Sequence, residues 1–161
     1  MNKVLTIQPH LCTGCRSCEM ACSLKHEEVC SPALSRIRVL KWGEVAVSVP
    51  LMCQHCEDPL CEKACPTGAR GRNVKTGAMV TDKEVCIGCR SCIHACPFGA
   101  PISHPSGKSI TCDLCEGHPE CAEACTPGAL SYSPAETGAM HIKRLYASHF
   151  VEMLKPHEKT A

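Results

Sequence analysis

The sequence contains few aromatic residues: two Phe, two Tyr and one Trp in 161 residues. A hydrophobic core in a chain of this length normally depends on aromatic bulk. The chain has 17 cysteines instead. We therefore expect something other than side chains to fill part of the interior.

Long apolar runs and a strong excess of one charge are also missing. No run approaches the roughly 18 apolar residues of a membrane span, so we expect no membrane-spanning segment. The formal net charge is +1, which excludes a strongly basic nucleic-acid binder. The first residues show neither a signal peptide nor a twin-arginine pair, which predicts a cytoplasmic location. Phosphate-binding loops and Ser-His-Asp sets are absent, so we expect no catalytic residue and no enzyme activity of its own.

Cysteine at this density is typical of disulfide scaffolds, zinc sites or iron-sulfur clusters. The odd number and the expected reducing compartment argue against disulfides. Sixteen cysteines form four groups of four. The groups are Cys12, Cys15, Cys18 and Cys22; Cys53, Cys56, Cys61 and Cys65; Cys86, Cys89, Cys92 and Cys96; and Cys112, Cys115, Cys121 and Cys125.

The four groups are copies of one repeat. The first and third are spaced Cys-x2-Cys-x2-Cys-x3-Cys, while the second and fourth widen the middle gap to four and five residues. Neighbouring residues repeat too, because Gly14 to Cys18 and Gly88 to Cys92 both spell Gly-Cys-Arg-Ser-Cys. In such loops three thiolates hold one cubane and the fourth reaches a neighbouring cluster. The spacing therefore indicates iron-sulfur clusters that exchange ligands between groups, with all-cysteine zinc sites as the alternative.

The segments between the groups predict a few regular elements. Alternating apolar residues on both sides of Lys41 to Glu44 predict a β-hairpin within about 35–50. A second hairpin is expected around 75–80, and 136–142 repeats its pattern. Short helices are expected after some fourth cysteines, most clearly over 22–28. A C-terminal helix is expected over about 142–155, with an apolar stripe of Ile142, Leu145, Tyr146, Phe150, Met153 and Leu154.

Other residues near the groups leave alternatives open. Arg16, Lys25, Arg70, Arg72 and Arg90 either offset the charge of bound clusters or are simply solvated. The seventeenth cysteine, Cys30, fits no group, and its role is open between an inert thiol and a redox or intersubunit function. His55 and His94 lie in or beside cysteine loops, where hydrogen bonding or solvent exposure is the default.

The second and third groups, Met52 to Ala69 and Cys86 to Cys92, resemble four-cluster, ferredoxin-like electron-transfer subunits of molybdenum, tungsten and nickel-iron enzymes. The resemblance covers about residues 3–142. It implies that group one pairs with group four, and group two with group three. The implied sets are Cys12, Cys15, Cys18 and Cys125; Cys22, Cys112, Cys115 and Cys121; Cys53, Cys56, Cys61 and Cys96; and Cys65, Cys86, Cys89 and Cys92. Four [4Fe-4S] clusters are expected, with these sixteen cysteines as the iron ligands.

The resemblance also implies a role in electron conduction between two partners. The segments 22–27 and 35–39 look most like the small iron-sulfur subunit of tungsten aldehyde oxidoreductase. The expected partners are a large catalytic subunit with a tungsten or molybdenum cofactor and an FAD-containing subunit or a ferredoxin. End-to-end self-association is a further possibility. The alternatives are a subunit of a hydrogenase, carbon monoxide dehydrogenase, formate dehydrogenase or benzoyl-CoA reductase, a free polyferredoxin, or a zinc-held interaction module.

The expected fold class is α+β. We expect a small irregular polyferredoxin domain over 1–161, made of two interlocked two-cluster halves with short β-hairpins and short helices. One half would comprise about 1–30 plus 106–141 and the other about 50–105. The hairpin would be an insertion, and the C-terminal helix would follow the second part of the first half.

Overall fold

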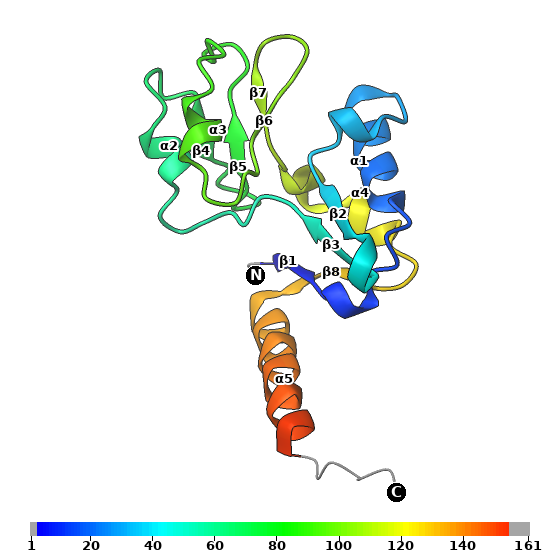
Figure 1. Cartoon of the computed structure of the whole chain (residues 1–161). Helices are drawn as coiled ribbons and strands as arrows, with labels where there is room; N and C mark the ends of the chain where they lie inside the picture. Colours follow the sequence, from blue (N-terminus) through cyan, green and yellow to red (C-terminus); the bar gives the residue numbers. More distant parts are fainter. Residues whose placement is uncertain (1–2, 155–161) are drawn as a thin grey trace, which may run out of the picture.

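The chain is described by a computed structural model, which covers residues 3–154. Short elements alternate with loops along it (Figure 1). In chain order the strands and α-helices are β1 (Lys3–Ile7), α1 (Ser17–Glu27), β2 (Arg38–Trp42), β3 (Val47–Leu51), α2 (Leu60–Lys63), β4 (Arg70–Arg72), β5 (Met79–Thr81), α3 (Ser91–Ala95), β6 (Ile102–Ser103), β7 (Ser109–Ile110), α4 (Glu120–Glu123), β8 (Leu130–Pro134) and α5 (Ala135–Leu154). Single 3-10 turns lie at Pro9–Leu11, Pro32–Leu34, Gly43–Val45 and Leu114–Gly117.

The strands form antiparallel pairs rather than one large sheet. β2 pairs with β3, β4 with β5 and β6 with β7, while β1 pairs with the distant β8. The register of β1 and β8 places Leu5 opposite Tyr132 and Ile7 opposite Leu130. The result is a small mixed helix and strand structure with short hairpins, in agreement with the expected α+β class. The interlocking of two halves and their boundaries remain predictions.

Two groups of elements occupy different sides of the molecule in Figure 1. Helix α1, early in the chain, packs against α4, late in the chain, and we call this the α1–α4 side. Helices α2 and α3 pack together with β4, β5 and β7 on what we call the α2–α3 side. Each side has its own buried cluster. Cys18, Cys22 and Cys121 pack with Ile37, Val39, Met52 and Leu130 on the first, and Cys53, Cys61 and Cys92 pack with Met79 and Ala100 on the second.

The hairpins at 35–50 and around 75–80 are confirmed, because β2 and β3 pair across Gly43–Val45 and β4 and β5 pair across the Lys75 region. The helix expected over 22–28 is confirmed as far as Glu27, because α1 covers Ser17–Glu27, whereas turns follow the fourth cysteines of the other groups. Helix α1 starts at Ser17, before the third cysteine of its group, and α2, α3 and α4 also begin ahead of a third cysteine. Each of these helices therefore contains the third cysteine of its group.

The C-terminal segment differs from its expectation at its start. Residues 136–142 repeat the pattern of a hairpin, but they form the first turns of α5, which begins at Ala135 rather than 142 and ends at Leu154. Gly138 lies where α5 meets the β1–β8 pair: a Cβ there would come within 2.9 Å of Thr6 Cγ2 and 3.0 Å of Val4 Cγ2. Close packing on β1 thus overrides the local pattern. The side chains of the predicted apolar stripe lie outside the described residues.

Helix α5 is the longest helical element and projects away from the rest of the chain (Figure 1). Among the described residues, none of the helices combines the length and the apolar character needed to cross a membrane.

Candidate metal centres

All 17 cysteines fall within the described part of the chain, and every one of them is a free thiol there. The most deeply buried thiols are distributed over all four groups. They are Cys18, Cys22, Cys53, Cys61, Cys86, Cys92 and Cys121. Such a concentration of unpaired, buried thiols in a chain with few aromatic residues agrees with an interior organised around bound metal.

One small cavity on the α1–α4 side is walled by four cysteines from the two ends of the chain. Cys12, Cys15 and Cys18 come from the first loop and α1, and Cys125 comes from the segment after α4. Val39 and Pro50 of the β2–β3 hairpin, with Ala129 and Leu130, complete its apolar lining. The structure thus brings together the first expected set of ligands.

A second cavity on the same side is walled by another four cysteines. Cys22 of α1 faces Cys112, Cys115 and Cys121 of the fourth group. Ile37, Met52 and Leu114 supply apolar neighbours, and His26, Arg36 and Asp113 supply polar ones. These four cysteines are the second expected set.

The α2–α3 side gathers cysteines of both remaining sets. Cys53, Cys61 and Cys92 are in one buried cluster, and Cys96 and Cys112 pack against it. Hydrogen bonding to Ser91 lowers the pKa of Cys89, and the Cys65 thiolate opposes this effect. Cys65 and Cys89 therefore lie near each other. The contacts of this side join groups two and three, but they do not divide their cysteines into two sets. That division stays a prediction.

The repeated Gly-Cys-Arg-Ser-Cys motif has the same conformation in both copies. Gly14 and Gly88 have φ of +69° and +73°, and Arg16 and Arg90 have φ of +66° and +65°. A helix begins at the serine in each copy. The left-handed glycine and arginine turn the chain sharply, so that consecutive cysteines can face the same space.

Gly88→Ala is expected to disrupt the third cysteine loop. A Cβ at Gly88 would lie 2.2 Å from the backbone oxygen of Gly107, in addition to the strain of its φ of +73°. Together these effects should cost about 2–5 kcal/mol of unfolding free energy. Anaerobic thermal unfolding and the iron content of the variant measure the effect.

Gly77→Ala is the matched control, since Gly77 has a φ of +74° and open space around its Cβ position. It should cost only about 1–2 kcal/mol and keep the wild-type iron content. Equal losses in the two variants would contradict the close approach of the Gly88 and Gly107 loops.

Several thiols of the α1–α4 side have pKa values raised by burial. Burial, followed by the charges of Glu19, Cys125 and Cys15, raises the pKa of Cys18 to about 12. Burial, Asp113 and neighbouring thiolates raise the pKa of Cys112 to about 12 and that of Cys115 to about 11. Iron binds the thiolate form. A cationic iron core is therefore the kind of group that these cavities fit, because it compensates several buried thiolates at once.

A buried arginine on the α2–α3 side gives independent support for an anionic group there. Arg70 is 3% exposed and forms none of the ion pairs found among the described residues. Its Nη2 donates to Cys61 Sγ at 3.4 Å and its Nη1 to Thr81 Oγ1 at 2.7 Å, while its Nε is buried without a hydrogen-bond partner. A buried guanidinium requires a compensating negative charge, which iron-bound thiolates supply.

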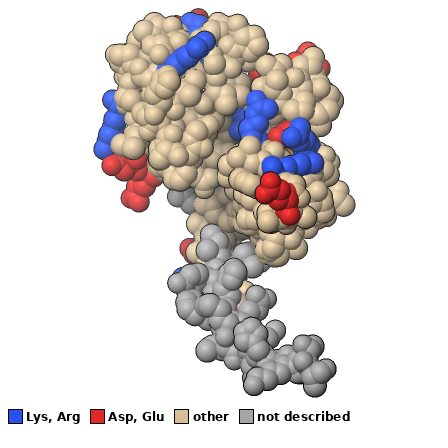
Figure 2. Space-filling model, viewed as in Figure 1, with Lys and Arg blue, Asp and Glu red and all other residues tan. Residues whose placement is uncertain are grey.

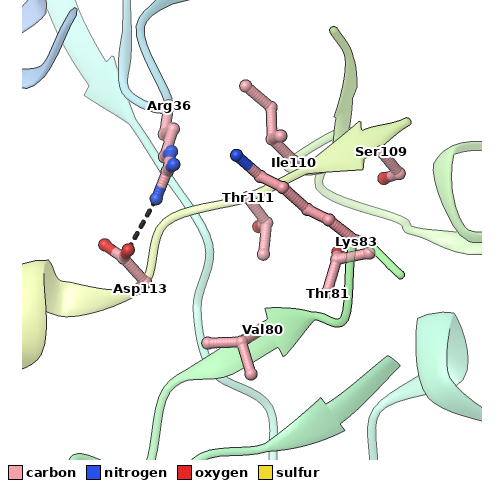
Figure 3. A pocket seen from close by; sticks show the side chains of 8 residues that line it. All are labelled: Arg36, Val80, Thr81, Lys83, Ser109, Ile110, Thr111 and Asp113. Carbon is pink, nitrogen blue, oxygen red and sulfur yellow. Dashed lines mark hydrogen bonds and ion pairs between the residues drawn. The ribbon is translucent and has the colours of Figure 1, made fainter. Parts of the chain in front are cut away.

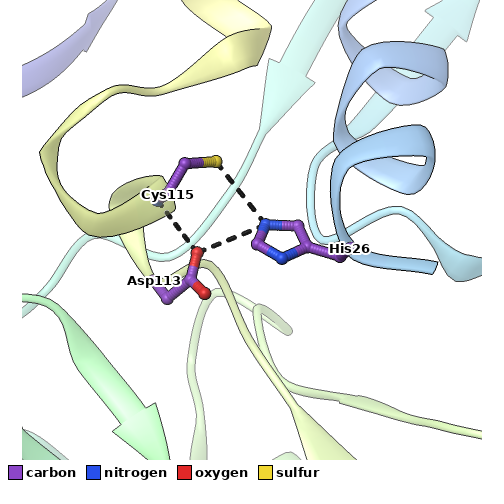
Figure 4. Close-up of side chains that lie close together, drawn as sticks. All are labelled: His26, Asp113 and Cys115. Atoms are coloured by element: carbon purple, nitrogen blue, oxygen red, sulfur yellow. Dashed lines mark hydrogen bonds and ion pairs between the residues drawn. The ribbon is translucent and has the colours of Figure 1, made fainter. Parts of the chain in front are cut away.

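Further polar groups surround the sulfur atoms of the second cavity. The Arg36 backbone N–H donates to Cys22 Sγ at 3.3 Å. Figure 4 shows one ring nitrogen of His26 facing both Asp113 and Cys115, with its Nε2 3.3 Å from Asp113 Oδ1 and 3.5 Å from Cys115 Sγ. Burial opposes ionisation of Asp113, but His26 and Arg36 hold the pKa of its carboxyl well below its usual range. Polar contacts of this kind adjust the reduction potential of a cluster.

A further cavity lies outside the cysteine groups. A polar cavity of about 240 Å³ is lined by Arg36, Val80, Thr81, Lys83, Ser109, Ile110, Thr111 and Asp113 (Figure 3). It contains no cysteine and no arrangement typical of a catalytic set. In the view of Figure 2 most of the surface is uncharged, with Lys and Arg in separate small patches.

The remaining residues singled out in the sequence have distinct positions. Cys30 and His94 are exposed. His55 is largely buried, its Nδ1 accepts from the Met79 N–H, and burial followed by the nearby Arg72 lowers its pKa to about 4. Among the basic residues, Arg70 is buried against sulfur, whereas Arg16, Lys25, Arg72 and Arg90 are exposed.

The sequence did not single out three residues that surround the cysteines. Glu19 is 2% exposed, and its Oε1 accepts from the Val39 N–H at 2.7 Å, which ties α1 to the β2–β3 hairpin. Arg36, which precedes β2, forms an ion pair of 2.6 Å with Asp113 of the fourth cysteine group. The position of Asp113 directly after Cys112 was the one sequence feature that could have indicated its role. Glu19 also lies directly beside a cysteine, but nothing in the sequence marks it as buried.

Comparison with protein families gives two matches. Residues 45–135 match the 4Fe-4S dicluster domain, and residues 9–25 match a 4Fe-4S binding domain. The polyferredoxin-like subunit of aliphatic sulfonate oxidoreductase from Pyrococcus furiosus is 45% identical over 122 residues, which are 75% of this chain and 70% of that protein.

Two relatives from Escherichia coli are also similar. The B subunit of anaerobic dimethyl sulfoxide reductase is 38% identical over 146 residues, covering 78% of this chain and 70% of its own length. Electron transport protein HydN is 36% identical over 156 residues, covering 81% and 87%. A protein in a solved structure of the benzoyl coenzyme A reductase complex BamBC aligns with 90% of this chain and 89% of its own length, at 26% identity and a TM-score of 0.49.

Proposed function

Because the chain belongs to the family of 4Fe-4S dicluster proteins, we propose that it is an electron-transfer subunit with four [4Fe-4S] clusters that connects a catalytic subunit to a second redox partner. The chain is an iron-sulfur protein whose relatives are electron-transfer subunits of oxidoreductase complexes. The number of clusters, their ligands and the partners belong to the proposal.

The observation that supports it most is the pair of cysteine-walled cavities on the α1–α4 side. Each is bordered by four cysteines, and each combines a loop from the start of the chain with one from its end. Such exchange of ligands between distant groups is the arrangement of two-cluster ferredoxins. The proposed ligands of the other two clusters are Cys53, Cys56, Cys61 and Cys96, and Cys65, Cys86, Cys89 and Cys92.

The bound clusters would supply one-electron redox chemistry, which no side chain of the chain provides. The chain's own residues have three tasks. The cysteines fix the positions of the redox centres, the apolar walls formed by residues such as Val39 and Met52 exclude water from them, and hydrogen-bond donors such as the Arg36 N–H act on the sulfur ligands. Exposed Cys15 and Cys89 lie at the surface, where partner proteins have access.

The proposed catalytic partner is a large subunit with a tungsten or molybdenum cofactor, and the proposed second partner is an FAD-containing subunit or a ferredoxin. Two relatives are named as subunits of a sulfonate oxidoreductase and a dimethyl sulfoxide reductase, which supports an oxidoreductase complex. We further propose that the complex is a tungsten aldehyde oxidoreductase. A cytoplasmic location belongs to the proposal as well.

Anaerobic affinity purification of the tagged chain from its native host tests the proposal. We expect a large subunit to copurify, together with tungsten or molybdenum measured by elemental analysis. Nickel in place of these metals would favour a hydrogenase or carbon monoxide dehydrogenase. An isolated chain with iron and sulfide would contradict the dedicated complex and favour a free polyferredoxin.

A further inference from the structure

Cys112 lies where the two sides of the molecule meet. It lines the cavity that also contains Cys22, and it packs against the buried cluster that contains Cys53 and Cys61. The Cys22–Cys112–Cys115–Cys121 site and the Cys53–Cys56–Cys61–Cys96 site are therefore direct neighbours across this junction.

The two neighbouring sites have different charges around them. On the Cys53 site, the guanidinium of Arg70 is buried and donates to Cys61 Sγ, and none of the ion pairs among the described residues neutralises it. Arginine keeps its charge at any ordinary pH, so this site contains a permanent unpaired cation.

On the Cys22 site, the charges largely cancel. Asp113 pairs with Arg36 at 2.6 Å and with His26 at 3.3 Å. The Asp113 carboxylate also accepts from the Cys115 backbone N–H at 2.9 Å. The Cys22 site therefore has an ion pair, Arg36 with Asp113, beside its sulfur atoms. The Cys53 site has the Arg70 cation beside Cys61.

We propose that Arg70 gives the Cys53–Cys56–Cys61–Cys96 site a higher reduction potential than the Cys22–Cys112–Cys115–Cys121 site, so that an electron at the junction resides on the α2–α3 side. A cluster becomes more negative by one charge on reduction, and a buried cation stabilises that form. With clusters bound, one electron would pass from the Cys22–Cys112–Cys115–Cys121 site to the Cys53–Cys56–Cys61–Cys96 site, and no bond or proton would change. This inference rests on the ligand sets of the proposed function.

The test is a redox titration of the purified full-length protein, monitored by electron paramagnetic resonance, with iron content measured in parallel. Arg70→Gln should keep its iron and lower the midpoint potential of one cluster. Arg70→Lys, which retains the charge, should stay closer to the wild type. Arg144→Gln removes an exposed positive charge on α5 and should move no midpoint.

A second variant keeps the test decisive if Arg70→Gln loads less iron. Asp113→Asn removes the carboxylate beside Cys112 and Cys115, so it should raise one midpoint, and in the wild type that midpoint should lie below the one that Arg70→Gln lowers. Unaltered midpoints in fully loaded Arg70→Gln, or in fully loaded Asp113→Asn, would overturn the inference. A wild-type protein without iron and sulfide would instead contradict the proposed function itself.

Discussion

Cys121→Ala is expected to remove one whole cluster, about four iron atoms per chain, and to destabilise the α1–α4 side. Cys121 is 5% exposed and lies on α4, which packs against α1. Burial and the nearby thiolates of Cys112, Cys22 and Cys115 raise the pKa of its thiol. Because cluster binding and folding are coupled, the iron analysis should show the loss and the thermal unfolding temperature should fall.

Cys30→Ala is the matched control for this variant. Cys30 is exposed and belongs to none of the four groups, so its removal should leave both iron content and unfolding temperature unchanged. If Cys121→Ala retained the iron content of Cys30→Ala, Cys121 would not be a ligand and the second expected set would be wrong.

Glu19→Ala is expected to destabilise the protein by about 2–4 kcal/mol, the cost of leaving buried polar groups without partners. The carboxylate accepts from the Val39 N–H and lies 3.8 Å from the Arg16 guanidinium. Since Val39 also lines the cavity of Cys12, Cys15, Cys18 and Cys125, iron loss on mild chelation should be faster in the variant. Chemical unfolding under anaerobic conditions measures the stability.

Glu19→Gln separates the hydrogen bond from the charge. A glutamine oxygen at the same position can accept from the Val39 N–H, so this variant should recover most of the stability lost in Glu19→Ala. An equally large loss in both variants would show that the link between α1 and the hairpin does not depend on this hydrogen bond.

The parts of the fold that depend on local patterns could be predicted from the sequence. Alternation on both sides of Lys41 to Glu44 is a property of neighbouring residues, and β2 and β3 pair as expected. The identical motif at Gly14 and Gly88 also produces identical turns. The same approach failed at 136–142, where Gly138 packs α5 closely against Val4 and Thr6. That contact depends on the β1–β8 pair, which joins opposite ends of the chain.

The candidate sites show the same limit. Cysteine spacing indicated clusters, and the structure brings two of the expected sets around separate cavities. The roles of the charged residues could not be foreseen. Arg70 and Arg72 are two positions apart and of the same type, but Arg70 is buried against Cys61 while Arg72 is exposed and donates to the Gly77 carbonyl. Arg70 is opposite Thr81 of β5 and donates to Cys61 of α2. These contacts between separate segments are not visible in the sequence.

The most direct test of four iron-sulfur clusters is the amount of iron and acid-labile sulfide per chain in protein purified without oxygen. The account predicts about sixteen of each, the content of four [4Fe-4S] clusters on sixteen cysteines. About two to four zinc atoms per chain with no sulfide, as expected of all-cysteine zinc sites, would contradict it.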